Sequence, residues 1–155
     1  MVLEGRVEGL LIASCASGEM VSLSEVQAVA DRGLKGDRYF YGRGHYSHWP
    51  GQGRDVTLIE AEVLASLPAS CAISAAQARR NIVTRDFRLN DRVGQFFRLG
   101  EVILYGVRLC EPCLYLDTLT RSGVMAALAG RSGLRADIMT SGVIHVGDVI
   151  ADVSV

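Results

Sequence analysis

The clearest fold signal in this sequence is LRADIMTSGVIHVGDVIADV, residues 134–153. Apolar and β-branched residues recur at 134–140, 143–146 and 149–153. Ser141-Gly142 and Gly147-Asp148 separate these runs and are typical turn residues. The stretch therefore predicts three short β-strands in succession.

The rest of the chain repeats this spacing of short strands and turns. Further strands are predicted at 4–14, 20–23, 26–30, 54–60, 81–84, 92–99 and 102–108. Short helices are predicted at about 60–67, stopped by Pro68, at 75–79 with Ser74 as N-cap, and from Thr120 or Ser122 to Leu128, ended by Gly130. Many short strands with two or three short helical insertions predict a mainly β (α+β) fold, a β-barrel.

Length and composition limit the classes of function. A chain of 155 residues suits a single domain, residues 1–155, that buries a full core. Its 16 basic and 17 acidic residues give a formal charge of -1, which argues against a nucleic acid or an anionic membrane as main partner. No apolar run approaches the roughly 20 residues that span a bilayer, and the N-terminus lacks a signal-peptide pattern. We expect a cytoplasmic protein.

Two thiols stand two residues apart in Cys110-Glu-Pro-Cys113. Such a pair can be half of a zinc site, which would need two more ligands, or a dithiol redox pair, which usually opens a helix after a strand. It can also be two small core residues, since free cysteine is commonly buried. The motif alone leaves all three interpretations open.

Two other motifs could bind an anion. Gly33-Leu-Lys-Gly-Asp-Arg38 combines glycines, whose backbone can approach a phosphate, with the charges of Lys35 and Arg38, although it could equally be a tight turn. Arg79-Arg-Asn81 ends a predicted helix, where it could cap carbonyls or combine an arginine grip on phosphate with an amide that reads a ring edge. His45, His48 and Trp49 are expected in an exposed loop rather than at a metal.

In this order, the motifs resemble the MOSC domain, the family named after the C-terminal domain of molybdenum cofactor sulfurase. The matching stretches are Gly33–Arg38, Asp55–Ile59, Arg79–Thr84, Leu89–Asn90, Val93–Gly94, Leu109–Cys113, Gly133–Ala136 and Gly142–Asp148. The likeness thus spans most of the chain.

The resemblance implies a distorted β-barrel that binds molybdenum cofactor (Mo-molybdopterin). In members similar to the mitochondrial amidoxime-reducing proteins, the second thiol ligates molybdenum, and this position falls on Cys113. Arg79, Asn81 and Arg135 fall on cofactor-contacting positions, and Lys35 and Arg38 are expected to neutralise the cofactor phosphate with Arg79. Those relatives have small or basic residues between the thiols, whereas this chain has Glu111-Pro112. Cofactor contacts from these two positions are therefore not carried over.

The leading hypothesis is a molybdenum-dependent oxidoreductase that reduces N-hydroxylated small molecules at a metal held by Cys113. Because the chain resembles the small stand-alone bacterial members, a separate protein would supply electrons. The alternative is a non-catalytic carrier of persulfide sulfur or of cofactor, loaded by a sulfur donor. A dithiol redox protein, which would need both Cys110 and Cys113, is the third possibility.

Overall fold

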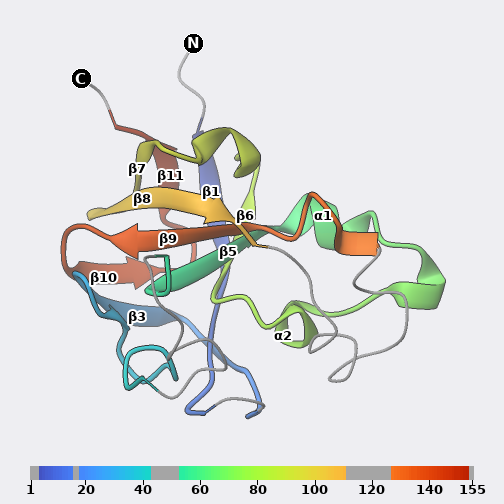
Figure 1. The fold of residues 1–155 in the computed structure, drawn as a ribbon, viewed down its shortest axis with the longest axis horizontal. Helices are drawn as coiled ribbons and strands as arrows, with labels where there is room; N and C mark the ends of the chain where they lie inside the picture. The colour runs from blue at the N-terminus through green and yellow to red at the C-terminus, as the bar shows by residue number, and fades with distance from the viewer. Residues whose placement is uncertain (1–3, 16–17, 43–52, 111–126, 154–155) are drawn as a thin grey trace.

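The computed structural model describes residues 4–15, 18–42, 53–110 and 127–153 (Figure 1). Its strands are β1 Glu4–Ile12, β2 Val21–Leu23, β3 Glu25–Val29, β4 Gly33–Leu34, β5 Val56–Glu60, β6 Ile82–Arg85, β7 Phe96–Leu99, β8 Val102–Leu109, β9 Leu134–Ile138, β10 Gly142–His145 and β11 Val149–Asp152. The helices are α1 Ala61–Ala65 and α2 Ala75–Ala78, with 3₁₀ turns at Ala69–Cys71 and Asn90–Arg92.

Seven strands close into a barrel. Around it they run β11-β7-β8-β9-β5-β6-β1, and β1 returns to β11 with Gly5 opposite Ile150. Only the β5–β6 pair is parallel among the barrel strands described. β2 extends β1 beyond the barrel, and β10, β3 and β4 form a separate small sheet. The predicted mainly β barrel with short helical insertions is confirmed.

The three tail strands form as predicted, but they do not pair with one another. β9 lies between β8 and β5, β10 pairs with β3, and β11 lies between β7 and β1. Each turn therefore sends the chain to a different part of the molecule. The alternation of apolar and polar residues within a strand predicts which face is buried. The strand with which it pairs is determined by closure of the whole barrel.

Two apolar clusters flank the barrel wall. One fills the barrel and includes Val56, Leu58 and Ile82, while the other lies under the helices and includes Ile59 and Val83. β5 is thus buried on both faces, which explains its continuous apolar sequence. Figure 1 shows α1 and α2 on the side of the barrel where β5 and β6 end.

Local differences from the predicted elements have identifiable causes. α2 begins at Ala75 with Ser74 as its N-cap, as predicted, and a capping box joins Ser74 and Gln77. The predicted helix at about 60–67 is shorter, because Leu67 leaves the helix to enter the second cluster. The predicted 92–99 strand covers only β7, since Arg92 ends a 3₁₀ turn in which its guanidinium contacts Asp152 at 2.7 Å. Of the predicted third helix, only residues 127–128 lie in the described part, and they are helical.

Gly133 should be the least replaceable glycine of this wall. It has φ +106°, and a Cβ there would collide with the backbone carbonyl oxygen of Leu58. Gly130 also has a positive φ, +76°, but its Cβ would meet nothing within 4 Å. We expect Gly130→Ala to cost about 1–2 kcal/mol of unfolding free energy and Gly133→Ala about 3 kcal/mol or more. Urea unfolding measures both, and equal losses would contradict the collision.

Candidate functional site

The glycine-containing loop after β4 buries an ion pair. Arg38 Nη1 lies 2.9 Å from Asp37 Oδ1, and the two side chains are 6% and 0% exposed. The same Asp37 carboxylate accepts hydrogen bonds from the backbone N–H groups of Ala13 and Tyr39, at 3.1 and 3.3 Å. Arg38 in turn donates its backbone N–H to Ala13 O at 2.6 Å. The loop is therefore fixed against the end of β1.

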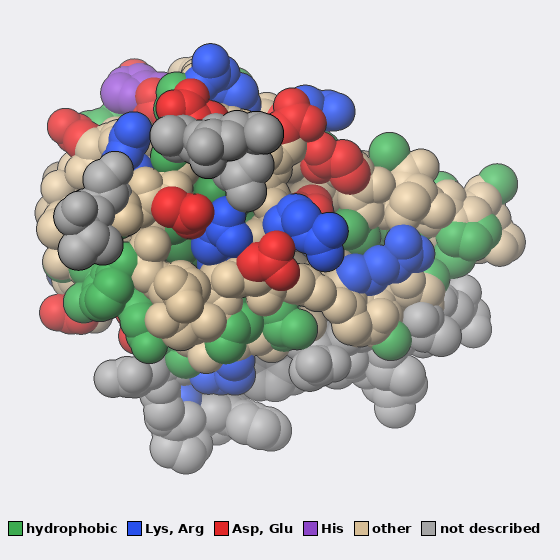
Figure 2. Space-filling model, turned by 90° about the horizontal axis from the view of Figure 1, so that it is seen from above, with side chains coloured by type: hydrophobic (Ala, Val, Ile, Leu, Met, Phe, Trp, Pro, Cys, Tyr) green, Lys and Arg blue, Asp and Glu red, His purple; other side chains and the backbone are tan. Residues whose placement is uncertain are grey.

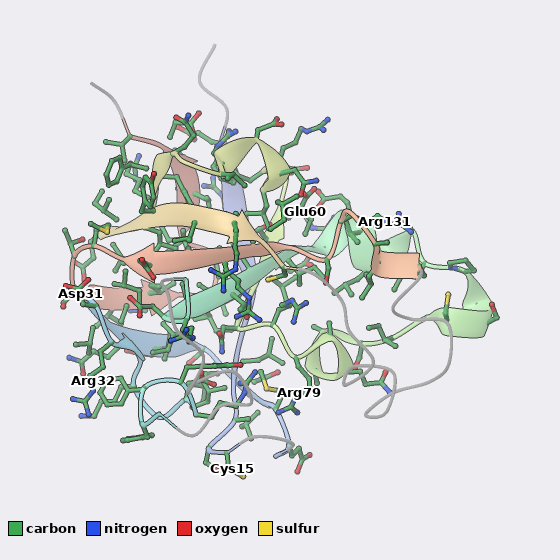
Figure 3. The ribbon with its side chains drawn as sticks, viewed as in Figure 1. Cys15, Asp31, Arg32, Glu60, Arg79 and Arg131 are labelled. Atoms are coloured by element: carbon green, nitrogen blue, oxygen red, sulfur yellow. The ribbon has the colours of Figure 1, made fainter. Side chains whose placement is uncertain are left out.

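Arg38 also contacts the residue that ends α2. Its Nη2 donates to the backbone oxygen of Arg79 at 3.3 Å. Arg79 adopts a left-handed conformation, φ 58° and ψ 34°, and its Nη1 donates to Gly18 O. Figure 3 shows Arg79 at the same end of the molecule as Cys15, which lies at the tip of the loop after β1. The structure thus brings Arg38 and Arg79 together from positions 41 residues apart.

Asn81 is bound into the protein scaffold. Its side-chain oxygen accepts from Thr57 N and Thr57 Oγ1 at 3.1 and 3.2 Å, and its Nδ2 donates to Leu11 O at 3.1 Å. The residue is fully buried. Asn81 therefore connects β1 and β5 to the start of β6 and fixes the backbone two residues after Arg79.

Arg135 lies on the barrel wall, and Lys35 lies in the same loop as Arg38. Arg135 is a half-buried residue of β9, opposite Thr57 of β5 and Arg108 of β8. It shares Thr57 as a neighbour with Asn81. Lys35 is exposed just after β4, and its backbone N–H donates to Gln27 O at 2.8 Å.

Of the two paired cysteines, the structure describes Cys110, and Cys113 lies outside the described residues. Cys110 is 1% exposed, and its backbone N–H donates to Gly133 O at 2.8 Å. The segment that carries Cys113 therefore leaves the barrel at the end of β8, beside the start of β9. His45, His48 and Trp49 also lie outside the described residues.

Asp37 is the site residue that sequence reasoning did not assign. The signal was a carboxylate directly before an arginine in a glycine loop, a pattern that also fits a solvated turn. With one carboxylate and two guanidinium groups, the cluster of Asp37, Arg38 and Arg79 has a net charge of +1. Because the carboxylate compensates one of the two guanidinium groups, the cluster can be buried and still bind an anion.

Charge elsewhere is mixed. On the face seen in Figure 2, blue Lys and Arg side chains stand among red Asp and Glu side chains. In residues 4–15, 18–42, 53–110 and 127–153, no group of three or more His, Cys, Asp and Glu side chains could hold a metal ion. Nor does this part of the chain contain a helix long and apolar enough to cross a membrane.

Solved structures with the same fold come from several bacteria. YuaD of Bacillus subtilis matches with a TM-score of 0.79 at 14% identity, over 99% of both chains. YiiM of Geobacillus stearothermophilus matches at 0.72 and 12% identity, over 97% of this chain and 75% of its own. YiiM of Escherichia coli matches at 0.68 and 17% identity, over 97% and 70%. No curated protein sequence matches this chain.

The family model of the MOSC domain matches residues 39–151, which is well over half of the chain. This match covers the barrel from β5 to β11 and both helices. It includes Arg79, Asn81, both paired cysteines and Arg135. The chain belongs to the MOSC domain family, whose members bind molybdenum cofactor.

Proposed function

We propose that this protein binds molybdenum cofactor with Cys113 as the metal ligand and reduces N-hydroxylated small molecules. The observation that supports the proposal is the convergence of Arg38 and Arg79 at one end of a MOSC barrel. Neither residue is near the other in sequence, so their contact is a property of the fold. A phosphate-bearing pterin needs such a basic anchor.

The chemistry of these residues fits the cofactor. Arg38 is buried and held by Asp37, so its guanidinium loses little further side-chain entropy when an anion binds nearby. Arg79 is fixed by its own backbone conformation and by Gly18. Two guanidinium groups suit a phosphate monoester, and a soft thiolate suits a sulfur-coordinated molybdenum. We therefore assign Arg38 and Arg79 to the phosphate.

The remaining assignments follow from position. Lys35 is exposed and available to a second phosphate oxygen, and Arg135, on the wall beside the end of β8, is assigned to the pterin. Asn81 was predicted to orient the pterin as well, and its bonds to Thr57 and Leu11 favour an action through the backbone that carries Arg79. When bound, the cofactor supplies two-electron oxygen-atom chemistry at its metal. Cys113 holds that metal as a thiolate and must lose its proton first.

Buried Cys110 weighs against the dithiol alternative. The thiol that attacks a partner's disulfide must be accessible, and Cys110 is almost fully buried, so in a dithiol protein Cys110 would have to act only as the second, resolving thiol. One working thiol, Cys113, is sufficient for metal ligation. The electron donor would be a separate protein, and the proposed location is the cytoplasm.

Replacing each paired cysteine separately tests the proposal. Protein made in cells that synthesise the cofactor should carry about one molybdenum and one pterin per chain. We expect Cys113→Ala to lose at least ten-fold of the bound molybdenum, because the metal loses its protein ligand. Cys110→Ala should retain it. Metal analysis and pterin fluorescence measure both, and reduction of an amidoxime with an artificial electron donor tests turnover.

Three results would count against this function. Equal loss of activity in both variants would indicate a dithiol enzyme. A persulfide on Cys113 by mass spectrometry, without any reductase activity, would indicate the sulfur carrier. Wild-type protein without molybdenum or pterin would remove the proposal altogether.

Arg79→Gln should weaken the phosphate anchor and leave the fold intact. The substitution keeps a long polar side chain and removes a charge-assisted contact, so we expect the dissociation constant for the pterin cofactor to rise about ten-fold or more. Arg88→Gln is the matched control, since the Arg88 side chain is 78% exposed and lies 3.3 Å from Asp91 at the surface. Fluorescence titration of cofactor-free protein measures the affinities. Equal affinities of the two variants would exclude Arg79 from the anchor.

A further inference from the structure

A second polar pocket lies apart from Arg38 and Arg79. It has a volume of about 250 Å³ and is open to solvent, and its walls come from the β3–β4 turn, the turn after β4 and the start of β5. The lining residues are Asp31, Arg32, Tyr39, Phe40, Gly42, Arg54 and Asp55. Figure 3 shows Asp31 and Arg32 at the edge of the molecule, well away from Arg79. Ligand pockets are commonly about 300–1,000 Å³, so this one suits a small molecule.

Four charged side chains line this pocket without pairing. Among the described residues, no ion pair within 4.0 Å joins Arg32 or Arg54 to Asp31 or Asp55. Asp31 and Arg32 are exposed, whereas Arg54 and Asp55 are half-buried, and half-buried charges usually find an opposite charge. Two positive and two negative groups therefore line one small pocket without forming ion pairs with each other.

Arg54 presents a buried edge of its guanidinium. Its Nε and Nη2 are shielded from solvent and have no hydrogen-bond partner in the described part of the chain. These two N–H groups lie on one side of the guanidinium and point the same way, which is the geometry that binds both oxygens of a carboxylate. A buried donor without an acceptor destabilises the protein, so a ligand acceptor here would relieve that penalty.

The opposite side of the pocket is acidic. Asp55 Oδ2 accepts a hydrogen bond from Ile138 N at 3.0 Å, which holds the carboxylate in place. Burial raises the pKa of Asp55 to about 6, with a further contribution from the nearby charges of Asp137 and Asp31. A positive charge brought into the pocket would relieve that repulsion. Asp31 is held by its own backbone N–H, which donates to Ile138 O at 3.0 Å.

Arg32, another lining residue, is held against Phe40. Its guanidinium carbon lies 3.9 Å from the centroid of the Phe40 ring, and its Nε donates to Phe40 O at 3.3 Å. The side chain is thereby stacked in place. A ligand entering the pocket would meet a preformed surface, which lowers the entropic cost of binding.

We propose that this pocket binds a small zwitterion of the amino acid class, with its carboxylate on Arg54 and its ammonium group facing Asp31 and Asp55. The carboxylate takes the two N–H groups of Arg54 that have no acceptor. The ammonium group separates two carboxylates that otherwise repel each other. The residues that would contact the ligand, Arg54, Asp31 and Asp55, are not those assigned to the cofactor, although Tyr39 of the pocket lining contacts Asp37 and Arg38.

Calorimetric titration with four probes tests the site. Alanine carries both charges, propionate carries the carboxylate alone, propylamine carries the ammonium alone, and inorganic phosphate is an anion of different shape. We expect alanine to bind at least ten-fold more tightly than each of the other three. Binding of alanine no tighter than propionate, or tighter binding of phosphate, would overturn the proposal.

Two substitutions should separate the two halves of the ligand. Arg54→Gln should weaken alanine and propionate alike, by ten-fold or more. Asp55→Asn keeps an oxygen that can accept from Ile138 N, and it should weaken alanine while leaving propionate unchanged or tighter. Arg88→Gln, on a distant exposed turn, should change neither affinity. Thermal unfolding checks that each variant is folded. If Arg54→Gln does not fold, Arg54→Lys takes its place, because lysine keeps the charge but lacks the paired N–H groups. Unchanged alanine affinity in the Arg54 variant would exclude the site.

Binding of alanine should also depend on pH. Besides Arg32 and Arg54, the charged groups at the pocket are the carboxylates of Asp31 and Asp55, with Asp137 beside them. As the pH falls through about 6, Asp55 gains a proton and no longer attracts an ammonium group, so alanine affinity should fall between pH 7.5 and pH 5. Propionate affinity should not fall over this range. A pH dependence that survives in Asp55→Asn would contradict the assignment.

Discussion

The buried ion pair between Asp37 and Arg38 is the contact on which this end of the molecule depends. Taking two charges out of water is expensive, and a buried pair contributes little net stability unless further hydrogen bonds satisfy its atoms. Here Asp37 also accepts from two backbone N–H groups, and Arg38 also donates to Arg79 O. The pair therefore joins the end of β1, the loop after β4 and the end of α2. Removing one partner would leave a buried charge and cost about 3–5 kcal/mol.

Asn81 supplies a second constraint that acts on the same region. Thr57 and Leu11 bind its side chain on neighbouring strands, so the start of β6 cannot move relative to β5 and β1. Arg79 lies two residues earlier, in a left-handed conformation that ends α2. Such conformations cost about 1–2 kcal/mol outside glycine and persist where the surroundings enforce them. The direction of Arg79 thus follows from the packing of three strands rather than from the arginine itself.

Sequence reasoning succeeded where the information is local. Alternation and turn residues predicted the tail strands, and Ser74 as N-cap predicted the start of α2, because both patterns act within a few residues. It failed where contacts between residues far apart in the sequence determine the structure. The partners of β9, β10 and β11 depend on barrel closure. The end of the helix near Leu67 depends on the second apolar cluster. Arg92 was predicted in a strand, but it lies in a 3₁₀ turn where it contacts Asp152. The contact of Arg38 with Arg79 is of this second kind. Only resemblance to a family pointed to both residues together.

The two arginine sites differ in what surrounds the guanidinium group. Arg38 has an acidic partner, a carbonyl oxygen and the thioether of Met20 around it, so its Nη1 and Nη2 each have a partner within the protein. Two buried N–H groups of Arg54 have no acceptor in the described part of the chain, even though Asp55 is the next residue. Folding alone would favour a pair between these neighbours, because it would remove an unsatisfied donor and a desolvated carboxylate together. Asp55 instead binds Ile138 N on β9, which keeps the two charges apart. A separation that costs stability in the unliganded protein is what a site for a ligand with two opposite charges requires.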